Sequence, residues 1–168
     1  IGFDVKNDVA ILRSSGVSGT PALRMHVNAS PGPSGAILGF PENGPYDVEP
    51  GRLGPTATAT TQDAYGRGPI RRRITTLRGE VRHGNSGGPM FNAEGEVVGI
   101  NAQIRSDSGT AEGVGFAIPI NAARRSMEQL IQTGEVRYAW LGVTTQTVTP
   151  RIAERFGLAE TSGAAVQT

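Results

Sequence analysis

A serine framed by glycines is the strongest chemical signal in this 168-residue sequence. The stretch Gly84-Asn85-Ser86-Gly87-Gly88-Pro89 sets one hydroxyl among residues that let backbone amides approach a substrate carbonyl. Acyl transfer needs an oxygen nucleophile and nearby N–H donors for the oxyanion of the tetrahedral intermediate. We predict that Ser86 attacks and that Gly84, Asn85 and Ser86 form the oxyanion hole, with the amides of Gly84 and Ser86 as donors. A plain glycine-rich turn between strands is the alternative.

The order of residues along the chain favours one fold over another. The same stretch fits Gly-x-Ser-x-Gly, the nucleophile elbow of α/β-hydrolases, but an elbow leads into a helix and precedes its acid and histidine. Here residues 96–100 have the composition of a strand, and no histidine follows Ser86. A chymotrypsin-type order of histidine, aspartate and serine needs an aspartate upstream on a strand. Asp8 opens the apolar run 9–12, so we predict it as the acid. An ordinary turn residue at the strand edge is the alternative.

Neither histidine stands where this triad needs one. His26 and His83 are the only histidines, and both follow Asp8. We interpret His26 as a strand side chain and His83 as a loop residue that shapes the cleft. A subtilisin-like set of Asp8, His26 and Ser86 has the right order, but the motifs that surround the serine and histidine of such enzymes are absent. We therefore expect the sequence to begin after the base, in the last strand of a preceding segment, and to be inactive alone.

Three motifs carry a family resemblance. They are Asp8-Val9-Ala10-Ile11-Leu12, the stretch from Gly84 to Pro89, and Gly113-Val114-Gly115-Phe116-Ala117-Ile118-Pro119. Together they resemble trypsin-like serine proteases of the HtrA (Deg) type, while residues 36–79 are closer to membrane-anchored periplasmic proteases of the acid-resistance type. The resemblance implies Asp8 as the triad acid, Ser86 as the nucleophile and Gly84 as an oxyanion donor.

The expected fold class is all-β: the C-terminal barrel of a chymotrypsin-like double β-barrel with one C-terminal helix, followed by a partial PDZ domain. The 24 glycines and 11 prolines favour short strands joined by many turns. Residues 1–20 would end the N-terminal barrel and form the inter-barrel linker, residues 21–134 the C-terminal barrel with its closing helix, and residues 135–168 a linker and the start of the PDZ domain. We expect one strand over 3–14, and then six barrel strands over 36–40, 52–62, 70–77, 90–91, 97–104 and 114–118. The pattern predicts a helix over 122–132, capped by Asn121 and ended by Gly134, and the PDZ resemblance implies a short helical insert over 149–157.

A substrate pocket is expected beside the nucleophile, for the residue before the scissile bond. The residues expected to line it are Glu80, Ile100, Asn101, Ala102, Gly113, Val114 and Gly115. Val114 between two glycines would narrow the pocket and favour small or medium apolar residues. Glu80 could instead reach the pocket floor and select a basic residue, or it could be a surface carboxylate paired with Arg82.

Composition limits the partners. The net charge of +1 argues against a general attraction to nucleic acid, although six arginines cluster before Ser86. No apolar run approaches the ~20 residues of a membrane span. The resemblance implies polypeptide substrates such as unfolded or damaged proteins, a role in quality control or stress response, and a place in the periplasm or cell envelope. We expect no cofactor, no metal and no nucleic acid. Self-association and a membrane anchor upstream of residue 1 stay open. The alternatives are a peptide-binding pseudo-protease or chaperone-like scaffold, and a module that binds nucleic acid or acidic surfaces through its arginines.

Overall fold

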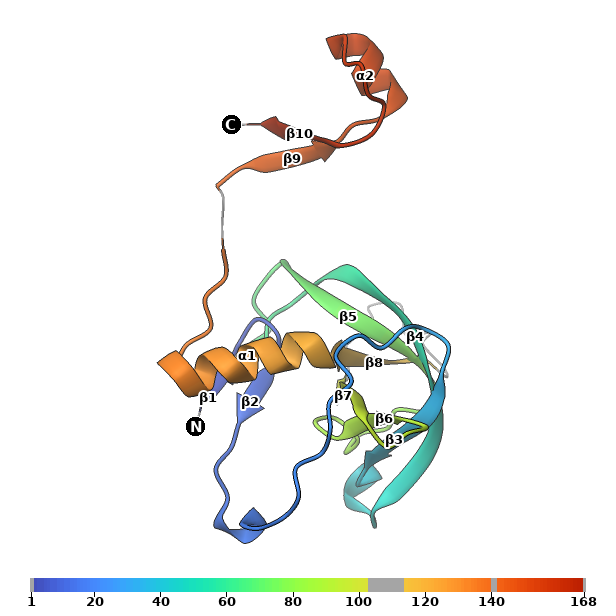
Figure 1. Cartoon of the computed structure of the whole chain (residues 1–168), viewed down its shortest axis with the longest axis vertical. Helices are drawn as coiled ribbons and strands as arrows, with labels where there is room; N and C mark the ends of the chain where they lie inside the picture. The colour runs from blue at the N-terminus through green and yellow to red at the C-terminus, as the bar shows by residue number, and fades with distance from the viewer. Residues whose placement is uncertain (1, 103–113, 140–141, 168) are drawn as a thin grey trace. The chain divides into compact units, whose positions relative to one another are not determined.

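The chain divides into two units, Ile1–Val136 and Arg137–Thr168. The structure is a computed structural model that describes residues 2–102, 114–139 and 142–167. Strands dominate the first unit, which also contains one long helix, α1, beside the strands (Figure 1). Within the described ranges, no helix is both long enough and apolar enough to cross a membrane. The expected domain boundaries at residues 20 and 134 stay a prediction.

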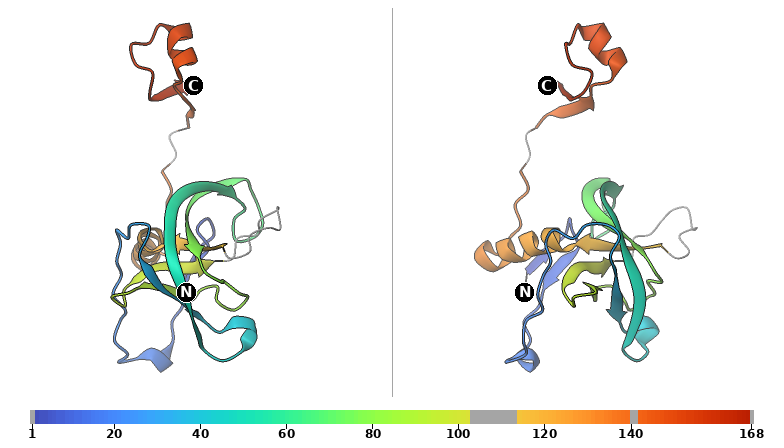
Figure 2. Two further views of the ribbon diagram at one scale, coloured as in Figure 1. Left: turned by 90° about the vertical axis from the view of Figure 1, so that its right-hand side faces the viewer. Right: turned by 45° about the vertical axis from the view of Figure 1, so that its right-hand side comes forward.

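Six antiparallel strands form a closed barrel in the order β3-β4-β5-β8-β7-β6. In chain order they are β3 Ser34–Gly39, β4 Asp47–Thr61, β5 Ile70–Arg78, β6 Pro89–Asn92, β7 Val97–Ala102 and β8 Val114–Pro119. Figure 2 shows the long strands β4 and β5 curving over one side of the barrel. Closure leaves no free sheet edge within this set of strands. The predicted mostly β fold is therefore confirmed.

Alternating side chains fill the barrel, as the strand period of two requires. The core consists of apolar side chains from all six strands: Ile37, Leu53, Leu77, Met90, Val98 and Ala117. One boundary differs from the prediction, because β4 begins at Asp47 rather than at residue 52. The earlier start of β4 is due to its pairing with β3, because Gly39 pairs with Asp47 and Leu38 with Val48. The pairing with β3 therefore keeps the residues before 52, Pro50 included, within the strand.

The first residues form a hairpin rather than the single predicted strand over 3–14. Strand β1 Gly2–Asp4 pairs with β2 Val9–Ile11, and residues 5–8 form the turn. The buried Asp4 carboxylate accepts hydrogen bonds from the amides of Lys6 and Asn7, at 3.1 and 3.2 Å, which closes this turn. A side chain that captures its own following amides is a common reason for a chain to reverse.

Helix α1, Ile120–Thr133, packs against this hairpin, as Figure 1 shows. The predicted capping role of Asn121 is wrong, because Pro119 occupies the N-cap position and no side chain caps the helix. Gly134 ends the helix in the left-handed conformation, as predicted. The buried side of the helix carries Ile120, Ala123, Ser126 and Leu130, whereas Ile131 is exposed.

The second unit contains a strand, a short helix and a second strand. Strand β9 Thr144–Thr147 pairs antiparallel with β10 Ala164–Gln167, and helix α2 Pro150–Phe156 lies between them in the chain. The Thr149 hydroxyl accepts a hydrogen bond from the Ile152 amide, and Gly157 closes the helix in the left-handed conformation. The helix expected near 149–157 is present. Its assignment to a PDZ domain stays a prediction.

Candidate active site

The loop between β5 and β6, residues 79–88, carries Ser86 and is called here the nucleophile loop. Ser86 is exposed, and its hydroxyl makes no hydrogen bond to any other described residue. Gly84 has a φ of +95°, a conformation that favours glycine. A Cβ at this position would lie 2.1 Å from the Phe40 carbonyl oxygen, so only glycine lets the loop pack this closely on the end of β3.

Two carbonyl groups fix the direction of the two predicted oxyanion donors. The His83 carbonyl accepts a hydrogen bond from the Glu42 amide at 2.6 Å, and the Asn85 carbonyl accepts one from the Gly88 amide at 3.0 Å. In a planar trans peptide the N–H points away from the preceding C=O. The amides of Gly84 and Ser86 therefore point away from these anchors. Within the described part of the chain, neither amide has a hydrogen-bond partner.

Asn85 stabilises the nucleophile loop through hydrogen bonds made by its buried side chain and its main chain. Its side chain is fully buried, its Oδ1 accepts a hydrogen bond from the Arg82 amide at 2.9 Å, and its own amide donates to the Arg82 carbonyl at 3.0 Å. Asn85 was also expected as part of the oxyanion hole, and its amide is thus engaged inside the loop in this structure. Its position is that of a residue that holds Gly84 and Ser86 in place.

Arg82 ties the nucleophile loop to β4. Its guanidinium contacts the carboxylates of Asp47, at 2.6 Å, and Glu49. Glu80 lies near the same guanidinium, with 3.8 Å between Oε1 and Nε, and its side chain is 67% exposed. Of the two alternatives for Glu80, the structure thus has the surface carboxylate beside Arg82.

Asp8 lies on the turn of the β1–β2 hairpin, next to the start of β2. It is exposed, has a φ of +59°, and its carboxylate makes no hydrogen bond or ion pair with other described residues. The turn is held from beneath by Asp4, which is 2% exposed. The Asp4 carboxylate accepts hydrogen bonds from the Asn7 side chain, at 3.1 Å, and from the Ser126 hydroxyl of helix α1. The sequence analysis missed Asp4, and its one local signal is an aspartate placed shortly before a turn.

His26 and His83 lie in different surroundings. His26 sits beside the β6–β7 turn, where its Nδ1 is 3.1 Å from a Glu96 carboxylate oxygen and its amide donates to the Val97 carbonyl. It is next to a single parallel bridge between Met25 and Val97, not within a strand. Since the Ser86 hydroxyl and the Asp8 carboxylate have no described side-chain partner, neither imidazole is bonded to them.

The described residues of the predicted pocket come from β7, β8 and the loop. Asn101 is buried, and its side-chain amide donates to the carbonyls of Leu38 and Pro89, at 3.2 and 3.3 Å. The main-chain carbonyl of Asn101 accepts a hydrogen bond from the Gly87 amide at 2.8 Å, so β7 also stabilises the nucleophile loop. Ile100 and Ala102 flank it on the strand. Gly113 and the Val114 side chain lie outside the described residues.

Val81 was missed by the sequence analysis and lies against Gly115 on β8. A Cβ on Gly115 would come within 2.0 Å of a Val81 methyl carbon, so the glycine makes room for the valine. Val81 also packs on the barrel core. The nucleophile loop is therefore anchored by an apolar side chain at its start as well as by hydrogen bonds near Ser86.

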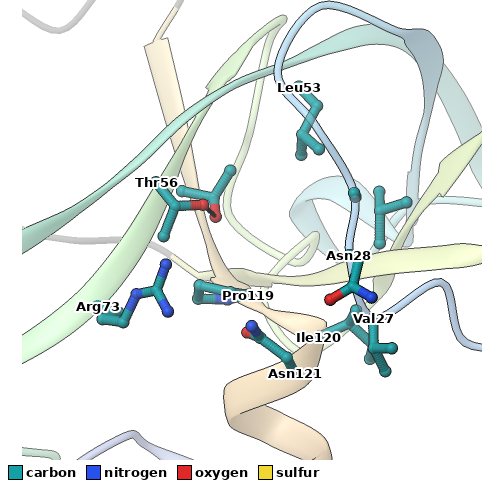
Figure 3. Close-up of a pocket in the computed structure, with 11 residues that line it drawn as sticks. Val27, Asn28, Leu53, Thr56, Arg73, Pro119, Ile120 and Asn121 are labelled. Atoms are coloured by element: carbon teal, nitrogen blue, oxygen red, sulfur yellow. Dashed lines mark hydrogen bonds between the residues drawn. The ribbon is translucent and has the colours of Figure 1, made fainter.

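A cavity of about 250 Å³ opens elsewhere on the first unit, and none of the predicted site residues lines it. Figure 3 shows three of the residues around this cavity. Arg73 comes from β5, Asn28 from the 21–33 segment and Asn121 from the start of α1. The hydroxyls of Thr56 and Thr75, also in its wall, are hydrogen-bonded to each other at 2.6 Å. The cavity is separate from the residues around Ser86.

A six-stranded barrel with an exposed serine, beside two amides that have no described hydrogen-bond partner, fits a trypsin-like serine protease. The family described as "Trypsin-like peptidase domain" matches residues 1–100, and the chain belongs to this family. Within it, the predicted HtrA-type resemblance is confirmed. The chain is 40% identical over 170 residues to a "Probable periplasmic serine endoprotease DegP-like" of Hahella chejuensis (strain KCTC 2396), covering 99% of this chain and 34% of that protein. It is 48% identical over 118 residues to a protein of the same name from Rhizobium meliloti (strain 1021), covering 68% and 23%.

Solved structures of HtrA-type and related proteases are also similar to this chain. "HtrA-type protease AlgW with tripeptide" aligns with a TM-score of 0.68 and 33% identity, over 88% of this chain and 48% of that one. The active form of the Rv3671c protease from M. tuberculosis aligns with a TM-score of 0.67 and 27% identity, over 83% and 60%. The chain spans about a third of the length of the first curated relatives it matches.

Proposed function

We propose that this chain provides the nucleophile, the oxyanion hole and the triad acid of a serine endopeptidase. The observation that carries the proposal is the pair of unpartnered amides at Gly84 and Ser86, which point away from their anchored carbonyls beside an exposed hydroxyl. Donors held in place before the reaction stabilise the developing oxyanion without reorganisation. Membership of the trypsin-like peptidase family supports the same assignment.

In the proposed reaction, the Ser86 oxygen attacks the carbonyl carbon of a peptide bond and its proton passes to an imidazole. The C–N bond then breaks, the imidazole protonates the leaving amine, and water hydrolyses the acyl group from Ser86. Asp8 would accept a hydrogen bond from the imidazole and stay ionised, fixing the tautomer. Neither His26 nor His83 is bonded to Ser86 or Asp8, so the base in this proposal comes from sequence outside the 168 residues.

We also propose polypeptide substrates and an extracytoplasmic location. The relatives are named periplasmic serine endoproteases, and two AlgW structures are named for a bound decapeptide and tripeptide. Quality control of damaged proteins, self-association and a membrane anchor belong to the same proposal and rest on the family resemblance alone.

Labelling with a fluorophosphonate tests the nucleophile. The polypeptide as encoded, with whatever precedes residue 1, should be labelled, and Ser86→Ala should not. Ser30→Ala, which removes another exposed hydroxyl, should label like the parent. Equal labelling of the parent and Ser86→Ala would contradict the proposal. Peptide binding without labelling or cleavage would favour the alternative, a peptide-binding scaffold.

Cleavage preference tests the pocket. We propose that it accepts small or medium apolar residues before the scissile bond, because Val81 fills space against Gly115 and Glu80 is exposed beside Arg82. Peptides with Val immediately before the scissile bond should therefore be cleaved faster than peptides with Arg at that position. A clear preference for Arg would reverse the assignment.

A further inference from the structure

Two large aromatic side chains lie exposed at the tip of the β3–β4 hairpin. Phe40 is 57% and Tyr46 is 55% exposed, and their rings meet edge to face with centroids 5.7 Å apart. The sequence has nine aromatic residues, and Phe3 and Tyr65 form a second exposed edge-to-face pair elsewhere on the first unit. Exposed apolar surface of this kind often marks a binding site.

This aromatic pair is attached directly to the nucleophile loop. The Phe40 amide donates a hydrogen bond to the Gly84 carbonyl at 3.3 Å, and the amide of Glu42, two residues later, donates one to the His83 carbonyl. On the other side of the pair, Asp47 follows Tyr46 and binds the Arg82 guanidinium at 2.6 Å. The backbone that carries the two rings is therefore held at a fixed place relative to the proposed oxyanion amides.

The barrel order shows which part of a substrate would reach them. Ser86 comes just before β6, and β6 pairs with β7 on one side and β3 on the other. The predicted pocket for the residue before the scissile bond is on the β7 and β8 side. A polypeptide that crosses Ser86 from that pocket leaves on the β3 side, where the tip of the β3–β4 hairpin carries the aromatic pair.

We propose that Phe40 and Tyr46 form a subsite for an apolar or aromatic side chain in the leaving half of the substrate, at the first or second residue after the scissile bond. This inference rests on the proposed function. Two rings in edge contact present an apolar surface to one further side chain, and aromatic groups gain from such packing beyond the area they bury. The subsite would make cleavage depend on the sequence after the bond as well as before it.

The test uses the encoded polypeptide and quenched peptides that share their residues before the bond and differ after it. Peptides with Phe or Leu at the first or second following position should be cleaved about tenfold better, in kcat/KM, than peptides with Gly there. Phe40→Ala and Tyr46→Ala should each remove most of this preference, while Tyr46→Phe should keep it. Tyr65→Ala, which removes a ring that is 65% exposed on another loop, should leave the preference intact.

Fluorophosphonate labelling separates this inference from the proposed function, because the probe carries no residue after a scissile bond. Labelling at the parental rate in Phe40→Ala and Tyr46→Ala, with loss of the preference, would support the subsite. Normal labelling without any preference in the parent, or with the preference kept in both variants, would overturn the subsite alone. Absence of labelling in the parent would overturn the proposed function and the subsite with it.

Discussion

The nucleophile loop and the β1–β2 turn both present an exposed side chain that has no hydrogen-bond partner among the described residues, but the molecule holds them in different ways. Ser86 depends on main-chain hydrogen bonds, since the amides of Glu42 and Gly88 fix the two carbonyls that orient its neighbours. Asp8 depends on a side chain, since the buried Asp4 carboxylate gathers the amides of the turn and reaches Ser126 on α1.

The difference fits what the proposed function requires of each region. An oxyanion hole needs two peptide planes turned to a defined angle, and only backbone contacts control that angle. A triad acid needs its carboxylate at a defined place, and a rigid turn is enough for that. Changes that disturb the backbone should therefore damage the nucleophile loop, and changes that remove one buried charge should damage the Asp8 turn.

The largest expected effect separates the two aspartates of the turn. Under the proposed function, Asp8→Ala should lower kcat by about 10⁴ in the encoded polypeptide, because the proposed imidazole would lose the carboxylate that orients it. It should change stability by no more than about 0.5 kcal/mol, since the Asp8 carboxylate is exposed and unpartnered among the described residues.

Asp4→Ala should show the opposite balance. It leaves the amides of Lys6 and Asn7 and the Ser126 hydroxyl without their acceptor, so unfolding should become easier by about 2–4 kcal/mol. Denaturant titration of the two variants checks this. A large stability loss in Asp8→Ala, or none in Asp4→Ala, would mean that the turn is not built around Asp4.

Gly84→Ala tests the backbone of the nucleophile loop. The new methyl group would meet the Phe40 carbonyl oxygen, so the loop must shift and the Gly84 amide must leave its position. Losing one oxyanion donor typically costs about 10² to 10³ in kcat. Gly95→Ala is the matched control, because Gly95 has a similar φ of +73° but nothing within 4 Å of the added carbon. If both variants lost rate equally, backbone strain rather than the position of the donor would be responsible.

The barrel could be predicted from the sequence because its signals are local. Alternating side chains mark β4 and β5, turn residues mark the breaks between strands, and Gly134 marks the end of α1. The predictions that were wrong concerned elements whose bounds depend on contacts with residues far away in the chain. The start of β4 is set by its pairing with β3, and the hairpin at residues 2–11 exists because Asp4 is buried against α1.

The candidate site divides in the same way. Ser86 and Gly84 belong to one short motif, so their roles could be proposed without a structure. The supports of the loop could not, because Arg82 binds carboxylates more than thirty residues earlier, 35 and 33 positions away, and Val81 packs on Gly115 of a later strand. A motif specifies the reacting group, whereas the contacts that hold it come from the folded barrel.

Arg82→Met should have a moderate effect on the loop. The guanidinium is about one-third exposed, so each of its ion pairs contributes at most about 1 kcal/mol, and screening by salt reduces this further. We expect a stability loss of about 1 kcal/mol at low salt and a smaller one at high salt, with faster hydrogen exchange at the Asn85 and Gly88 amides. Arg124→Met, which removes an exposed pair with Glu128 on α1, should cost about 0.5 kcal/mol and leave these amides unchanged. Equal exchange rates in the two variants would show that Arg82 does not steady the loop.

The smallest expected effect lies at the β6–β7 turn, away from both regions. A hydrogen bond from the Asn92 side chain, aided by the charges of Arg24 and His26, holds the pKa of Glu96 below its ordinary value of 4.5, although burial works in the other direction. A carboxyl whose pKa is lower in the folded state than in the unfolded one stabilises the fold above the ordinary value, and this contribution is lost as the pH falls through the lowered pKa. The stability difference between the parent and Glu96→Gln should therefore shrink as the pH falls below 4.5. Denaturant titrations across that range check the sign. A difference that grew with acid would mean that the protonated form of Glu96 is the one bound by Asn92.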